Sequence, residues 1–279
     1  MKKVSLIIAS AMIVFATSCK DNKKESEEEV DTTMTEEASM EEETEMNASE
    51  SEITLSSLEG SPAYETSTLK LNSPNEDNVA SGAPIKFSFE VNDYELGVPT
   101  EGSENMELAN SAKGQHIHFI VDNDPYSAHY EPTFEKELED GNHVLVAFLS
   151  RSYHESVKNA ESFVVKKIAV GETEDDELGN VDLTQPHLIY SRPKGIYSGE
   201  GAKTIMLDFF LLNTDLAEDG NKVRATINGK EFMITTWEPK LINGLPMGEN
   251  TIKLELLDAN GELIDSPFNP VERTVTLEE

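Results

Sequence analysis

Residues 114–126, GQHIHFIVDNDPY, align with residues 220–232, GNKVRATINGKEF, at an offset of 106. After one inserted residue the match continues at an offset of 107, where GNHVLVAFL at 141–149 falls on GENTIKLEL at 248–256. A self-match at a nearly constant spacing indicates two copies of one structural module. The sequence therefore predicts a tandem repeat, and residues at equivalent positions of the two copies can be compared.

The stretch that opens this repeat has the pattern of a β-strand. Ile117 and Phe119 alternate with His116 and His118, as the two faces of a strand require. The Asn228-Gly229 pair in the second copy is a strong signal for a hairpin turn. Several short strands in about 100 residues, without a long helical period, are typical of an immunoglobulin-like β-sandwich. We therefore predict an all-β fold with two tandem immunoglobulin-like β-sandwich modules.

The module boundaries follow from the repeat and from an acidic stretch between its copies. We place module 1 at residues 64–172, an acidic linker at 173–182 and module 2 at 183–279. The chain has one cysteine, Cys19, which lies outside both modules. Modules of this size can bury a sufficient core without disulfides.

Residues 1–18 have the layout of a bacterial lipoprotein signal peptide. Two lysines precede an apolar run that is too short to span a membrane, and the run ends in ATSC, which resembles a lipobox. In that family the cysteine is lipidated and becomes the new N-terminus, which makes Cys19 the expected lipid anchor to the membrane. The alternative is an ordinary secretory signal followed by an incidental cysteine.

The segment after the signal, residues 19–63, is predicted to be a disordered acidic tether. Residues 20–60 carry 15 acidic residues against three lysines, and few large apolar residues interrupt them. Such a composition buries too little surface to offset chain entropy. The segment resembles the export signals of Bacteroidota surface lipoproteins, although a simple solvated spacer would have the same composition. We expect an outer-membrane lipoprotein on the periplasmic or the surface-exposed face.

The charge balance excludes one class of partner. The chain has a formal net charge of −32 and no basic cluster in either module. Phosphate backbones are held by clustered lysine and arginine, so nucleic acid is not an expected partner. A protein or peptide of the envelope or cell surface is the remaining expectation.

The two modules differ in which strand faces are apolar. One strand of module 1 is apolar on both faces, and an early strand of module 2 is apolar where module 1 is polar. The extra apolar residues are Val144, Val146 and Phe148 in module 1, and Met206, Phe210 and Leu212 in module 2. Either the long loop at 97–113 covers the module 1 face, or the two faces cover each other across a domain interface.

Histidines are concentrated in module 1, which holds five of the six. His116 and His118 lie on one face of a strand, a spacing that can place two imidazoles at one metal ion. The equivalent residues of module 2 are Lys222 and Arg224, a pattern that favours a solvated polar face instead. A metal ion is therefore a candidate ligand, and no other cofactor is predicted.

A second candidate site is the loop that contains Ser150, Arg151, Tyr153 and His154. An arginine fork, hydroxyls and loop amides can hold a phosphate or a carboxylate. Module 2 has Asp258 opposite Arg151, so the loop is not part of the shared scaffold. A solvated polar loop without a ligand is the alternative.

Several blocks, including GQHIHFIVDNDPY, VAFLSRSYHES and LTQPHLIYSRPKG, resemble a family of flavobacterial lipoproteins. Its members are often automatically named "phosphopeptide-binding protein", and the resemblance implies no established activity. That name suggests the forkhead-associated domain, which binds phosphothreonine through an arginine, a Ser-x-x-His stretch and an Asn-Gly pair. Ser150, Arg151 and His154 are similar to that stretch with one extra residue, but the Asn-Gly pair lies in module 2.

The chain has no Gly-x-Ser-x-Gly elbow, no His-Glu-x-x-His motif and no phosphate-binding loop. We therefore expect a protein that is not an enzyme. The first interpretation is a lipid-anchored binding or scaffold protein that takes a phosphopeptide or another anionic ligand on module 1. The alternatives are a metal-binding lipoprotein that uses His116 and His118, and a purely structural envelope protein.

Overall fold

The computed structural model describes residues 52–279. The predicted signal peptide, Cys19 and the tether as far as residue 51 lie outside the described residues, so these remain predictions. Within the described part of the chain, no helix is long and apolar enough to cross a membrane.

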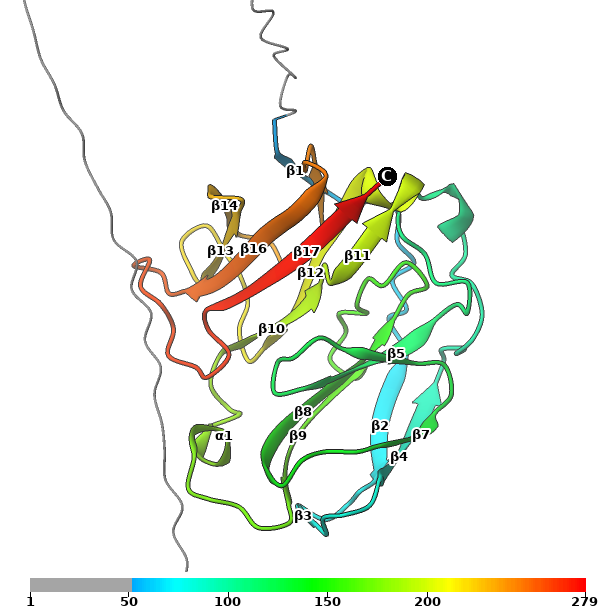
Figure 1. The fold of residues 1–279 in the computed structure, drawn as a ribbon, viewed down its shortest axis with the longest axis vertical. Coiled ribbons are helices and arrows are strands. Elements are labelled where there is room, and N and C mark those ends of the chain that lie inside the picture. Colours follow the sequence, from blue (N-terminus) through cyan, green and yellow to red (C-terminus); the bar gives the residue numbers. More distant parts are fainter. Residues whose placement is uncertain (1–51) are drawn as a thin grey trace, which may run out of the picture. The chain divides into compact units, whose positions relative to one another are not determined.

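Module 1 is a sandwich of a three-stranded sheet, in the order β2-β4-β7, and a five-stranded sheet, in the order β3-β9-β8-β5-β6 (Figure 1). Alternate residues of β4 and β5, such as Phe87 and Phe119, point into the core between them. The strands are β2 (Thr68–Ser73), β3 (Asn78–Val79), β4 (Ile85–Asn92), β5 (His116–Val121), β6 (Ser127–His129), β7 (Thr133–Lys136), β8 (Gly141–Ser150) and β9 (Phe163–Val170). A 3-10 turn, η1 (Ser103–Asn105), lies in the long loop before β5.

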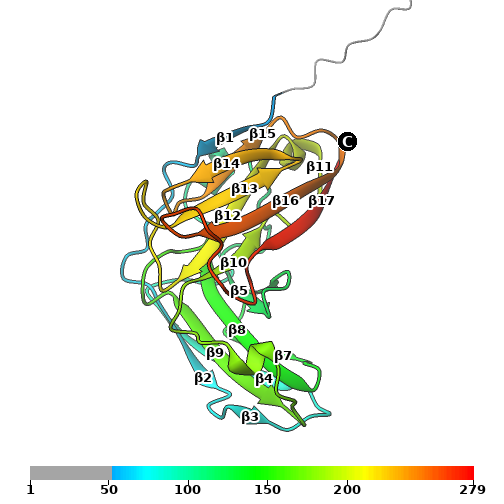
Figure 2. The same ribbon diagram turned by 90° about the vertical axis from the view of Figure 1, so that its left-hand side faces the viewer.

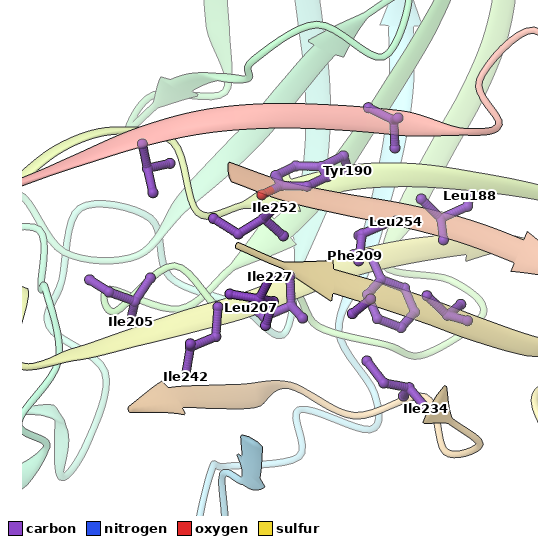
Figure 3. Close-up of a cluster of buried hydrophobic side chains, with 14 of the residues drawn as sticks. Leu188, Tyr190, Ile205, Leu207, Phe209, Ile227, Ile234, Ile242, Ile252 and Leu254 are labelled. Atoms are coloured by element: carbon purple, nitrogen blue, oxygen red, sulfur yellow. The ribbon is translucent and has the colours of Figure 1, made fainter. Parts of the chain in front are cut away.

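Module 2 repeats the sandwich with a four-stranded sheet, β1-β15-β12-β10, and a five-stranded sheet, β11-β17-β16-β13-β14. Its core, drawn in Figure 3, is built by alternate residues such as Phe209, Ile227 and Leu254. The strands are β1 (Thr54–Ser57), β10 (His187–Arg192), β11 (Gly195–Ser198), β12 (Thr204–Leu212), β13 (Lys222–Ile227), β14 (Lys230–Ile234), β15 (Lys240–Asn243), β16 (Gly248–Leu257) and β17 (Val271–Glu278). The short turn η2 (Gly199–Ala202) precedes β12, and the helix α1 (Glu177–Asn180) lies in the predicted linker. The all-β prediction of two tandem immunoglobulin-like sandwiches is confirmed.

The predicted end of the tether at residue 63 was wrong. Residues 54–57 form β1, which pairs antiparallel with β15 at the edge of module 2 (Figure 2). Leu55 packs against the module 2 core, and this apolar contact adds to the backbone hydrogen bonds of the pair. The chain thus contributes a strand to module 2 before it builds module 1.

The two apolar faces singled out in the sequence cover each other, except for Met206, which is buried outside the shared cluster. A third apolar cluster joins β5 and β8 of module 1 to β10 and β12 of module 2 within one compact unit. At its centre Phe148 stacks on Phe210 with ring centroids 4.8 Å apart and an interplanar angle of 13°. The interdomain hypothesis is therefore confirmed, and the expectation that the loop at 97–113 covers Phe148 was wrong.

Candidate metal centre

His116 and His118 point toward module 2, because β5 presents them on the face that carries the interdomain contact. In the register of β5 and β8, His118 lies opposite Phe148, and His116 lies opposite Ser150. Both imidazoles are 0% exposed, so the expectation of a solvated polar face was wrong. The physical reason is that module 2 covers this face, with Ser191 Oγ of β10 lying 3.3 Å from His118 Nδ1.

A third histidine joins the pair from the loop after β8. The backbone of His154 has a φ of 72°, in the left-handed region, and its N–H donates to the carbonyl of Arg151 at 2.8 Å. His154 Nδ1 lies 3.1 Å from His116 Nε2, and His118 Nε2 lies 2.9 Å from the same atom. The three ring nitrogens that can bind an ion are within 4.8 Å of one another. The sequence analysis had placed His154 in a separate anion site.

Further contacts orient these rings. His116 Nδ1 donates to the carbonyl of Gly114 at 2.8 Å, which leaves the lone pair on Nε2, where the other two histidines converge. The ring of Tyr126 stacks on His118 with centroids 3.5 Å apart. Its hydroxyl lies 3.1 Å from His154 Nδ1 and is a further polar group at the cluster.

Burial keeps the three imidazoles neutral. The pKa of His116 is lowered to about 4, mainly by burial and also by the nearby charges of Arg192 and Lys194, while the hydrogen bond to Gly114 opposes the shift. Burial likewise lowers the pKa values of His118 and His154. A metal ion binds the neutral imidazole, so at neutral pH the cluster can bind an ion without a change in its net charge.

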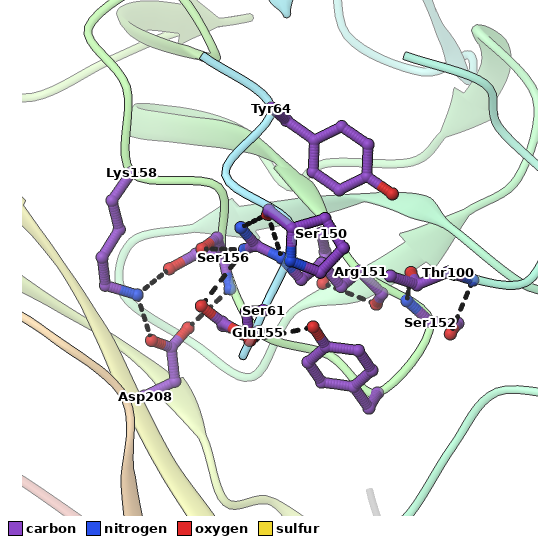
Figure 4. Close-up of polar contacts among 12 residues, drawn as sticks. Ser61, Tyr64, Thr100, Ser150, Arg151, Ser152, Glu155, Ser156, Lys158 and Asp208 are labelled. Carbon is purple, nitrogen blue, oxygen red and sulfur yellow. Dashed lines mark hydrogen bonds and ion pairs between the residues drawn. The ribbon is translucent and has the colours of Figure 1, made fainter. Parts of the chain in front are cut away.

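Arg151, the centre of the predicted anion site, is buried and already engaged (Figure 4). Its guanidinium donates from Nε to the carbonyl of Pro62 at 3.0 Å and from Nη1 to that of Ser156 at 2.9 Å. Glu155 pairs with Nη1 at 3.2 Å. The donors that would hold a phosphate are therefore used within the fold.

The other loop residues behave in the same way. Ser150 and Tyr153 are buried, and the Tyr153 hydroxyl donates to Ser61 Oγ at 2.9 Å. Ser61 and Pro62 belong to the segment that the sequence analysis assigned to the tether, so these partners could not be anticipated. Of the four predicted anion-site residues, only His154 reaches a candidate ligand site.

The remaining histidines lie outside the cluster, and His143 gives a pH prediction. Its Nδ1 lies 2.6 Å from Asp122 Oδ2, and this hydrogen bond raises the pKa of His143. The raised pKa means that protonated His143 stabilises the fold when the pH is below about 6.5, its pKa in the unfolded chain. This stabilisation is lost as the pH rises through its pKa in the folded chain. We expect His143→Asn to lower the free energy of unfolding by roughly 0.5–1 kcal/mol more at pH 5.5 than at pH 8.5. The difference is small because solvent screens this partly exposed pair. Urea unfolding at both pH values measures this, and equal costs would contradict it.

No family model matches the chain. No curated protein matches it either. Among solved structures, the chain is similar to the fibronectin(III)-like modules of Clostridium thermocellum CbhA, with 13% identity over 76% of this chain and 94% of that chain, at a TM-score of 0.26. It is also similar to the glucan-locus protein SGBP-B of Bacteroides ovatus, solved with a mixed-linkage heptasaccharide, with 11% identity over 75% and 70% of the two chains, at a TM-score of 0.22. A third match, β-glucuronidase 3 of Bacteroides uniformis, has 8% identity over 76% and 25%, at a TM-score of 0.22. Likeness at these identities and TM-scores is too low to transfer a ligand or an activity.

Proposed function

We propose that the protein is a non-catalytic, extracytoplasmic metal-binding lipoprotein, in which His116, His118 and His154 bind one zinc or copper ion. The observation that carries the proposal is the convergence of three ring nitrogens, two from buried histidines and one from the partly buried His154, with neighbouring distances of 2.9 and 3.1 Å. The membrane anchor at Cys19 and the envelope location rest on the layout of the first 19 residues.

The donor set decides which ions fit. Three imidazoles suit zinc and copper, whereas calcium and magnesium require oxygen ligands. Zinc–nitrogen bonds of about 2.0–2.1 Å in a tetrahedral site place the nitrogens about 3.4 Å apart. Two of the observed separations are shorter than this by a few tenths of an ångström, and the third lies within 4.8 Å, so ring rotations would have to bring all three nitrogens to one ion.

Zinc titration of the full-length chain, in competition with a chelator, tests the proposal. The variant His116→Asn/His118→Asn keeps a side-chain N–H close to each Nδ1 and removes both Nε2 ligands. We expect its affinity to fall by more than the roughly 10–100-fold that loss of an outer contact costs. His143→Asn is the matched control, since it removes a histidine outside the cluster and installs the residue that module 2 carries there, Asn250.

The outcomes separate the candidate functions. Loss of affinity in the double variant with no change in the control supports the metal centre. Equal affinity in the double variant and the wild type would remove these histidines as ligands. A wild-type chain that binds neither zinc nor copper would leave the purely structural envelope protein as the better interpretation.

A further inference from the structure

Module 2 contributes polar contacts to a cluster whose three histidines all belong to module 1. The residues after β10 line the cluster: Lys194 Nζ donates to the carbonyl of Tyr126 at 2.6 Å and lies 3.9 Å from the centroid of its ring. Ser191, within β10, is 1% exposed, and its hydroxyl contacts His118 Nδ1 at 3.3 Å. Lys194 holds the ring of Tyr126, which stacks on His118, whereas Ser191 contacts His118 directly.

Without a bound ion, the neighbours of His116 and His118 indicate where each of these two rings carries its proton. A carbonyl only accepts, so His116 carries its proton on Nδ1, facing Gly114, and a lone pair on Nε2. His118 Nε2 lies 2.9 Å from that lone pair, closer than His154 Nδ1 at 3.1 Å, and we assign the donated proton to His118 Nε2. His118 Nδ1 then has a lone pair, and it accepts a hydrogen bond from the Ser191 hydroxyl.

Binding of an ion reverses this arrangement at His118. To bind through Nε2, the ring must give up the Nε2 proton and carry one on Nδ1, which keeps the imidazole neutral. The Nδ1–H then needs an acceptor in a site from which water is excluded. A serine hydroxyl both donates and accepts, so Ser191 can satisfy His118 in either state by rotating its own proton.

We propose that Ser191 is a positioning residue of the metal centre: its hydroxyl holds His118 in the tautomer that binds the ion. This inference rests on the proposed metal site. Because Ser191 belongs to module 2, it also implies that ion binding and the docking of module 2 on module 1 are linked. By thermodynamic reciprocity, the bound ion then stabilises the interface by the free energy with which the interface strengthens ion binding.

Two measurements on the full-length chain test this, with zinc as the probe. Ser191→Ala should lower zinc affinity by about 10–100-fold, the usual effect of removing a hydrogen-bond partner of a metal-bound histidine. The matched control is Ser266→Ala, which removes a hydroxyl 2.7 Å from Nδ1 of His187, a histidine outside the cluster, and should leave zinc affinity unchanged. Thermal unfolding of the ion-free variants shows whether each one is folded.

The second measurement needs no substitution. Long-range proton–nitrogen NMR spectra of the wild-type rings distinguish the two tautomers, and zinc should move the His118 proton from Nε2 to Nδ1. Either a Ser191→Ala chain that binds zinc like the wild type or a His118 ring that keeps its Nε2 proton in saturating zinc would overturn the role of Ser191. In both cases, wild-type zinc binding that is lost in His116→Asn/His118→Asn would preserve the metal site. A wild-type chain that binds no zinc or copper would remove the proposed function and this inference together.

Discussion

Replacing Phe210 by alanine is expected to lower the free energy of unfolding by about 3–5 kcal/mol. Phe210 is 0% exposed and stacks on Phe148 of the other module. It also packs against Phe163 and Trp237, with ring centroids 4.9 and 5.0 Å away. The substitution leaves a cavity between two sheets that cannot easily move together, so we expect a loss in the upper half of this range. Chemical denaturation of the wild type and the variant measures it.

A double-mutant cycle shows whether this energy belongs to the interface. Phe148→Ala and Phe210→Ala should couple by roughly 0.5–1.5 kcal/mol, the usual value for an aromatic pair. Phe87→Ala is the matched control, since this ring is equally buried but lies in the core of module 1 alone. Coupling of Phe87 with Phe210 as large as that of Phe148 with Phe210 would contradict a specific interdomain contact.

Comparison of the two copies located this interface in the sequence but could not choose between its two explanations. The excess apolar residues on β8 and β12 showed that something must cover each face. Whether the cover is a loop or the other module depends on how the chain turns at the linker, which no periodicity encodes. The same limit applies to the start of the fold, because β1 forms only where the edge of β15 is available to it.

Part of the candidate metal centre could be predicted from the sequence. The spacing of His116 and His118 placed both on one face of a strand, but the lysine and arginine at the equivalent positions of module 2 favoured a solvated face. The missing fact was cross-strand register: His118 lies opposite Phe148, so the histidine face and the unexplained apolar face are the same surface. His154 was missed as a partner because it is 36 residues along the chain from His118 and reaches the cluster through a left-handed backbone turn.

Loss of the carboxylate of Asp208 is the second change for which we expect a large effect. This side chain of β12 is 0% exposed and faces module 1, where Oδ1 lies 2.6 Å from Lys158 Nζ and Oδ2 accepts from the backbone N–H of Ser156 at 3.0 Å (Figure 4). Arg192, a buried cation, is its cross-strand partner on β10. Asp208→Asn should lower the free energy of unfolding by about 3 kcal/mol, because it leaves the largely buried Lys158 ammonium without its counter-ion.

The size of this effect depends on burial rather than on the presence of an ion pair. Glu200 and Lys203 form a pair at 2.7 Å with side chains that are 81% and 63% exposed, so Glu200→Gln is the matched control and should leave the stability almost unchanged. Lys158→Met combined with Asp208→Asn should cost less than the two single changes added together, since removing both partners leaves fewer unpaired charges. Urea denaturation of the four variants and the wild type measures these differences. Additive single changes, or an Asp208→Asn cost no larger than that of the control, would mean that the interface does not depend on the ion pair between Asp208 and Lys158.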